Sequence, residues 1–191
     1  MLLHSGRLVC ILVFTLAPSA FAQSDFEDTN GRAESGDASA QIALAFMYAD
    51  GEGVKQDDHE ALNWFKRAAE QGSLSAQQIV GIWYLAGRGA PQNYQEAFKW
   101  LKLAARHGNS GAQSEIAQMY EIGRGVPQSF FLAYVWYSLA NTTMPRGSGP
   151  IISGAAFARD RVARELSPQA LEQAQAQATR CFESNFKDCG E

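Results

Sequence analysis

A nine-residue motif occurs three times in the chain, and its copies stand 36 residues apart. The copies read YADGEGVKQ at 48–56, YLAGRGAPQ at 84–92 and YEIGRGVPQ at 120–128. Other columns keep the same register: Gly36/Gly72/Gly108, Ala40/Ala76/Ala112, Gln41/Gln77/Gln113 and Trp64/Trp100/Trp136. A fixed period of this length is typical of a solenoid, in which each unit is one supersecondary element that stacks on its neighbours.

The apolar spacing inside each unit predicts two helices. The first, helix A, carries apolar side chains at i, i+4, i+7 and i+8, as in Ala40, Leu44, Met47 and Tyr48. The second, helix B, carries them at Ala61, Trp64, Phe65 and Ala68. The alanines allow close approach of the two backbones, and one Trp and one Tyr per unit fill the space between units. We therefore predict an all-α fold, an α-solenoid of antiparallel helix pairs.

The paired glycines of the motif have two possible meanings, a turn or a phosphate-binding loop. Gly51, Gly87 and Gly123 each follow the last apolar residues of helix A, where a left-handed glycine commonly ends a helix. A phosphate-binding loop would need a preceding strand and a Lys-Ser/Thr pair at the next helix start, and the sequence has neither. The glycines are therefore predicted to be structural.

The repeated pattern A-Q-x-x-x-A/G-x-x-Y-x-x-G-x-G-V/A-x-Q, followed by A-x-x-W-x-x-x-A, resembles the Sel-one-like repeat, a relative of the tetratricopeptide repeat. The resemblance covers residues 36–143, as units 36–71, 72–107 and 108–143. It implies a right-handed superhelix whose A helices line a concave surface. It also implies an adaptor or scaffold rather than a catalyst.

Both ends of the stack are predicted to carry caps, because a solenoid must close its core. Residues 23–35 supply an N-terminal cap, with a short helix at about 26–35. Residues 144–191 supply the C-terminal cap, with helices at 154–166 and 168–183 after a Gly/Pro-rich loop at 142–153. The third helix B needs this cover, since Leu132, Val135 and Leu139 replace polar residues at positions of its predecessors.

The N-terminal 22 residues read as a secretory signal peptide. His4 and Arg7 precede an apolar run at 8–16, and Ala20-Phe21-Ala22 has the small-x-small pattern of a cleavage site. A retained anchor is the alternative, although the run is shorter than the 20 or so residues that span a membrane. We expect a periplasmic or secreted protein without stable membrane insertion after cleavage.

The net charge of the chain limits the class of partner, and its cysteines favour a disulfide. Without residues 1–22 the chain has 15 Lys and Arg against 20 Asp and Glu, a net charge of −5 that argues against nucleic-acid binding. In an exported chain, the two remaining cysteines, Cys181 and Cys189, favour a disulfide. A pair of free thiols or a weak metal site is the alternative. We expect no cofactor, and a monomer.

One catalytic pattern is present, the S-x-x-K of Ser184 and Lys187. The resemblance gives it some relevance, because some secreted members of the repeat family are linked to penicillin binding and lactam hydrolysis. The accompanying S-D-N and K-T-G motifs are absent from the sequence. His59 and His107 lie beside no second ligand type at metal spacing, and we interpret both as solvated surface.

The remaining candidate site is the face of helix A that turns away from the core columns. It carries Ile42, Phe46 and Ala49 in the first unit, Gln78, Ile82 and Leu85 in the second, and Ser114, Gln118 and Glu121 in the third. Apolar groups on such a stripe mark a binding surface or, alternatively, a tight groove whose walls bury one another. Arg88 and Arg124 at its rim could meet acidic side chains of a partner.

The leading hypothesis is a non-enzymatic module of the cell envelope that binds a protein or peptide in its concave groove. The predicted partner-binding residues are Phe46, Gln78, Ile82, Leu85, Arg88, Gln118 and Arg124. The alternative hypothesis is an envelope hydrolase or binder of cell-wall peptides or β-lactams.

Overall fold

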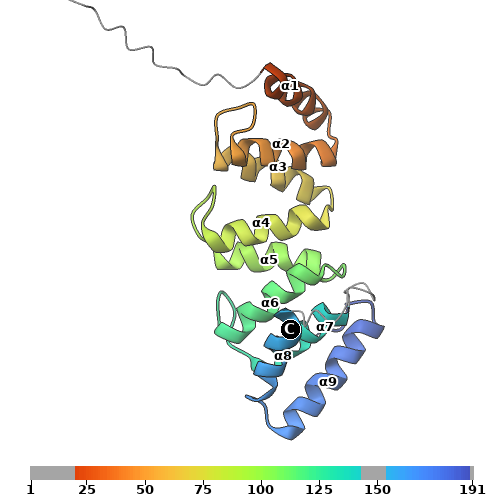
Figure 1. Ribbon diagram of the computed structural model, residues 1–191. Coiled ribbons are helices and arrows are strands. Elements are labelled where there is room, and N and C mark those ends of the chain that lie inside the picture. Colours follow the sequence, from red (N-terminus) through yellow and green to blue (C-terminus); the bar gives the residue numbers. More distant parts are fainter. Residues whose placement is uncertain (1–19, 143–153, 190–191) are drawn as a thin grey trace, which may run out of the picture.

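The computed structural model describes residues 20–142 and 154–189, which form nine α-helices and no strand (Figure 1). Three helix pairs follow the predicted units: α2 (Ala38–Asp50) with α3 (Asp58–Glu70), α4 (Leu74–Ala86) with α5 (Tyr94–Ala105), and α6 (Ser110–Ile122) with α7 (Phe130–Thr142). Before them lies α1 (Ala20–Glu34), and after them lie α8 (Gly154–Ala163) and α9 (Pro168–Glu183). The predicted all-α stack of helix pairs is confirmed.

The ends of the A helices follow from the repeated sequence. Asp37, Ser73 and Asn109 cap the starts of α2, α4 and α6, and each side chain accepts a backbone N–H of the first turn. The other ends are closed by Gly51, Gly87 and Gly123, whose φ angles of 74°, 71° and 69° are left-handed. The prediction that the first glycine of each pair terminates helix A is therefore confirmed.

The second glycines of the second and third pairs, Gly89 and Gly125, have a further role, which is contact with the preceding unit. A Cβ atom on Gly89, whose φ is +71°, would collide with the backbone carbonyl of Asp58 at the start of α3. A Cβ on Gly125 would lie 2.6 Å from the Cβ of Tyr94 at the start of α5. Only a residue without a side chain lets the loop pack this closely on its neighbour.

The core contains the predicted alanine and tryptophan columns, with Trp64, Trp100 and Trp136 each at most 8% exposed. A buried glutamine on each A helix links consecutive units. The Nε2 atoms of Gln41, Gln77 and Gln113 donate to the carbonyl oxygens of Ala33, Ala69 and Ala105 at 3.1, 3.0 and 3.1 Å. Because Ala33 belongs to α1, this helix takes the place of a helix B from a preceding unit.

The caps lie where predicted, with two differences in length. Helix α1 begins at Ala20, so the predicted start near Phe26 is wrong, and α8 ends at Ala163, three residues before the predicted end. Both α8 and α9 pack on α7, burying Val135 and Leu139 completely or nearly so. Residues 1–19 of the predicted signal peptide and the loop at 143–153 lie outside the described residues.

A disulfide between Cys181 and Cys189 closes the C-terminal tail, with the two Cα atoms 4.4 Å apart. Phe186 between them is buried and contacts Gly108 at the junction between the second and third units. In the part of the chain that is described, none of the helices has the length and apolar character needed to cross a membrane.

Candidate functional site

The predicted site lies on the A-helix face, which we define as the outward side chains of α2, α4 and α6. It consists of Ile42, Phe46, Gln78, Ile82, Leu85, Ser114, Gln118 and Glu121. A Cβ on Gly111 of α6 would collide with the amide group of Gln78 on α4, so these two helices lie directly side by side. The A-helix face is therefore continuous from the second unit to the third.

The first two units make this face apolar. Phe46 is 47% exposed, and its ring meets that of buried Phe65 edge-on at a centroid distance of 5.0 Å. Phe65 in turn meets Trp83 of the next unit at 5.2 Å, so a buried aromatic ladder holds the exposed ring. Ile82 and Leu85 are half-buried, whereas Ala49, which we expected on the exposed stripe, is only 2% exposed.

Arg88 lies in a contact between units rather than at a free rim. Its Nε and Nη2 atoms donate to Oδ1 of Asp58 on α3 at 2.9 and 2.7 Å. Nη2 also donates to the carbonyl of Ala49 at 3.1 Å, and the guanidinium stacks over Trp83. The Arg88 guanidinium is therefore already paired within the protein, and its contacts join the first unit to the second.

Arg124 occupies the same column one unit later and has a different neighbour. Tyr94 stands where the first junction has Asp58, and the Arg124 guanidinium lies 5.5 Å from the centre of its ring. The Arg124 side chain is exposed. A contact between a cation and an aromatic ring is weaker than a hydrogen-bonded ion pair with a carboxylate. Of the two predicted rim arginines, only Arg124 keeps its charge available to a partner.

In the third unit the A-helix face is polar and meets the C-terminal cap. Arg161 of α8 donates from Nε and Nη2 to the two carboxylate oxygens of Glu121 at 2.9 and 2.8 Å. The Tyr137 hydroxyl also donates to Glu121, at 2.9 Å. Burial, and then this hydrogen bond, raise the pKa of Tyr137 above its ordinary value of 10, so the phenol stays protonated.

A pocket of about 450 Å³ lies beside this ion pair, between α6, α7 and α8. Its lining includes Ser114, Glu115 and Gln118 of α6, and Gly154, Ala155 and Ala158 of α8. Burial raises the pKa of the Glu115 carboxyl above its ordinary value. Glu115 was not among the residues predicted from the sequence. Its column holds Ala43 and Ile79 in the other units, so a charged residue there departs from the repeat and could have indicated a site.

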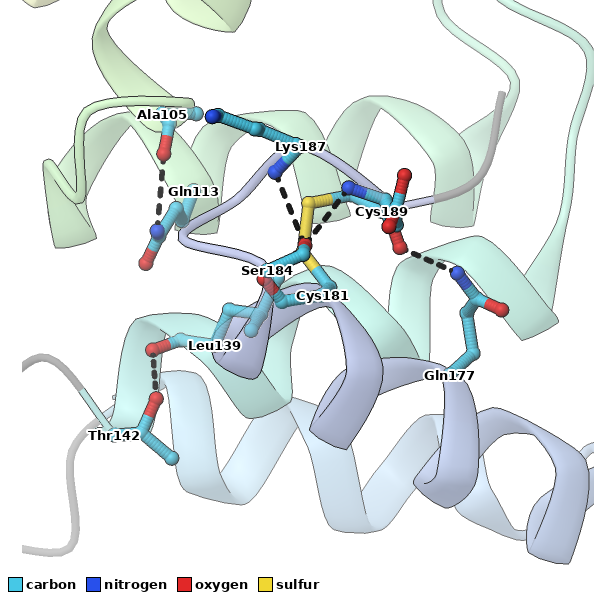
Figure 2. The surroundings of a disulfide bond; sticks show 10 residues. Ala105, Gln113, Leu139, Thr142, Gln177, Cys181, Ser184, Lys187 and Cys189 are labelled. Atoms are coloured by element: carbon cyan, nitrogen blue, oxygen red, sulfur yellow. Dashed lines mark hydrogen bonds between the residues drawn. A yellow bond between two sulfur atoms is a disulfide. The ribbon is translucent and has the colours of Figure 1, made fainter.

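The S-x-x-K pattern forms a turn in the C-terminal tail (Figure 2). The Ser184 hydroxyl donates to the carbonyl of Cys181 at 3.0 Å and accepts the backbone N–H groups of Lys187 and Asp188 at 3.2 and 2.9 Å. Figure 2 shows the Lys187 side chain pointing away from that hydroxyl. The hydroxyl proton is thus held by a carbonyl, and Lys187, the base of the motif, points away from it.

His59 and His107, which the sequence predicts to be solvated surface residues, are both exposed. Within residues 20–142 and 154–189, there is no group of three or more His, Cys, Asp or Glu side chains that could hold a metal ion.

The Sel1 repeat family model matches residues 38–73, 74–109 and 110–141. The chain belongs to the Sel1 repeat family. Sel1 repeat proteins typically mediate protein–protein interactions, and the repeat is generally a non-catalytic scaffold. Among curated proteins, none matches this chain.

Two solved structures are similar to it. The crystal structure of a Sel1 repeat protein from Oxalobacter formigenes is 35% identical, with a TM-score of 0.60 over 73% of this chain and 98% of that chain. The protective antigen c5321, present in uropathogenic Escherichia coli strains and displaying an SLR fold, is 26% identical, with a TM-score of 0.72. That match covers 84% of this chain and 34% of the antigen.

Proposed function

We propose that this Sel1 repeat protein is a non-enzymatic interaction module of the cell envelope, which binds a protein or peptide segment along its A-helix face. The observation that carries the proposal is the exposure of Phe46, a large apolar residue that is 47% exposed on the helix stack. Ile82 follows it in the same column of the next unit. Apolar groups that reach the surface at matching positions of a helix stack are typical anchors for a partner.

The envelope location is supported by the tail. A disulfide between Cys181 and Cys189 is characteristic of proteins in oxidising compartments, where thiols stay paired. The apolar run and the Ala-Phe-Ala site near the N-terminus agree with export. A periplasmic or secreted protein has both features.

The alternative of a hydrolase or lactam-binding protein is supported by no feature of the described residues. Its only sequence motif places Ser184 in a backbone turn, where its hydroxyl makes three local hydrogen bonds. A serine nucleophile requires an adjacent base to take its proton. We therefore propose binding without chemistry.

Changing Phe46→Asp and Ile82→Asp together tests the binding face. The two aspartates would place charges against the apolar surface of a bound partner. We expect them to weaken partner binding by about 3 kcal/mol, more than a hundredfold. The measurement is quantitative co-purification of envelope proteins with the tagged protein. Helical content and the thermal melt should stay close to wild type, because Phe46 is half exposed and Ile82 is only partly buried.

Leu103→Asp is the matched control, since Leu103 is 41% exposed on α5 and lies off the A-helix face. It should leave the recovered partners unchanged. Unaltered recovery with the Phe46/Ile82 variant, or equal loss with Leu103→Asp, would contradict the proposed face.

A further inference from the structure

The pocket between α6, α7 and α8 continues the A-helix face at its C-terminal end. Gln118, which lines the pocket, stands in the same column as Phe46 and Ile82. Along this column the side chains change from apolar to polar, and α8 adds a wall that the first two units lack. A segment lying over Phe46 and Ile82 would therefore reach the pocket with its next residues.

The charges around the pocket leave one carboxylate uncompensated. On α8, Arg161 binds both oxygens of Glu121, and on α7 the protonated Tyr137 donates to the same carboxylate. On α6, Glu115 forms no hydrogen bond or ion pair with any described residue. The arginine and Glu121 neutralise each other, so the described residues of the pocket carry a net charge of −1 from Glu115.

The walls of the pocket suit a side chain with an apolar stem and a cationic head. Ala155 and Ala158 of α8 are small, apolar and nearly buried, and they form one side. Ser114 and Gln118, on either side of Glu115 along α6, add neutral hydrogen-bond acceptors on the other. Lysine and arginine combine these two properties, since their methylene stems lie along apolar surface while the charge reaches a polar group.

We propose that this pocket receives a lysine or arginine side chain of the segment that binds along the A-helix face. The inference rests on the proposed function, and it specifies the partner: a basic residue over the third unit and apolar residues over the first two. An acidic side chain would meet the unpaired Glu115, and a purely apolar one would leave that carboxylate desolvated without a partner.

In the unbound protein, the ionised Glu115 carboxylate lowers the free energy of unfolding, which agrees with a cationic occupant of the pocket. A carboxyl group whose pKa burial has raised binds its proton more tightly in the folded than in the unfolded chain. The free energy of unfolding therefore decreases as the pH rises from the ordinary value near 4.5 through the raised one. A cation entering the pocket would compensate the buried charge.

The test uses pools of fluorescein-labelled, acetylated nonapeptide amides. Each pool has randomised apolar positions and one fixed position, scanned along the peptide, that holds Lys, Arg, norleucine or Glu. Fluorescence anisotropy titrations measure the dissociation constant. With the wild-type protein, we expect the best Lys or Arg pool to bind about tenfold more tightly than the matching norleucine pool.

Variants assign this preference to Glu115. In Glu115→Gln the preference should fall to less than about twofold, while Glu172→Gln, an exposed glutamate of α9, should keep it. Glu115→Lys should invert the preference in favour of the Glu pool, and inversion cannot result from partial unfolding. Phe46→Asp should weaken all pools alike.

The outcomes separate this inference from the proposed function. Equal binding of the Lys and norleucine pools to wild type, or a preference that survives in Glu115→Gln, would overturn the cation pocket. The binding face would still stand if Phe46→Asp weakened every pool. Failure of all pools to bind the wild-type protein would contradict both.

Discussion

Two junctions in this molecule are closed by an arginine and a carboxylate, yet they are built differently. Between the first and second units, Arg88 of the repeated loop binds Asp58 on α3. Between the third unit and the C-terminal cap, Arg161 of α8 binds Glu121 on α6. Arg88 belongs to the 36-residue pattern, whereas Arg161 has no counterpart in it. The arginine of the first junction recurs one unit later as Arg124, with Tyr94 in place of Asp58, whereas the arginine at the cap occurs once.

The difference also separates the two halves of the A-helix face. At the first junction the arginine lies in a loop, and the exposed ring of Phe46 stays open to a partner. At the second junction the arginine comes from a helix that closes one side of a pocket. A partner would therefore meet an apolar surface over the first two units and a polar pocket over the third.

The largest expected effect concerns the repeated junction. Gly89→Ala should lower the free energy of unfolding by about 3 kcal/mol, because the new methyl group meets the Asp58 carbonyl and the residue keeps a left-handed φ of +71°. Urea unfolding followed by circular dichroism measures the change.

Gly72→Ala is the control for the backbone alone. Gly72 has a φ of +90°, but a Cβ there meets nothing within 4 Å. We expect a loss of about 1 kcal/mol from the left-handed conformation. Equal losses in the two variants would show that the glycine loop does not pack tightly on the preceding unit.

A smaller effect is expected at the cap. Cys189→Ser should lower the free energy of unfolding by about 2 kcal/mol, since the disulfide closes only a short loop. Hydrogen exchange should show the loss of protection in α9 and the tail, with α2 to α5 unchanged. Reductant should act on wild type in the same way and leave Cys189→Ser unaffected. Lower protection of α2 to α5 in Cys189→Ser would contradict this prediction. So would a wild-type protein whose free energy of unfolding does not change with reductant, because the disulfide would then not stabilise the cap.

The same contrast explains how much the sequence could predict. The helix pairs, the glycine ends of the A helices and the buried tryptophans each occur three times. Because each position could be read from three copies of the sequence, these features were predicted accurately. The start of α1 was misplaced by six residues because upstream of the first unit few columns repeat. Repetition makes a local pattern readable, and single elements lack that support.

The repeated pattern does not predict contacts between residues that lie far apart in the sequence. Arg88 was predicted at a groove rim because its partner lies 30 residues earlier, in a column where Asp58 is replaced by Tyr94. Glu121 was assigned to the open face because Arg161, 40 residues later, covers it only after α8 packs on α7. Such pairings depend on how the helices stack, which the spacing of apolar residues does not encode.

The most direct test of the binding face is site-specific photo-crosslinking in the native envelope. A photoreactive benzoylphenylalanine replaces Phe46, Ile82 or Leu103 in turn, and mass spectrometry identifies the attached peptides. We predict that positions 46 and 82 capture neighbouring residues of one partner segment, with a basic residue on the side toward the third unit, and that position 103 captures none of it. Capture of the same segment at position 103, or unrelated adducts at positions 46 and 82, would contradict binding along the A-helix face.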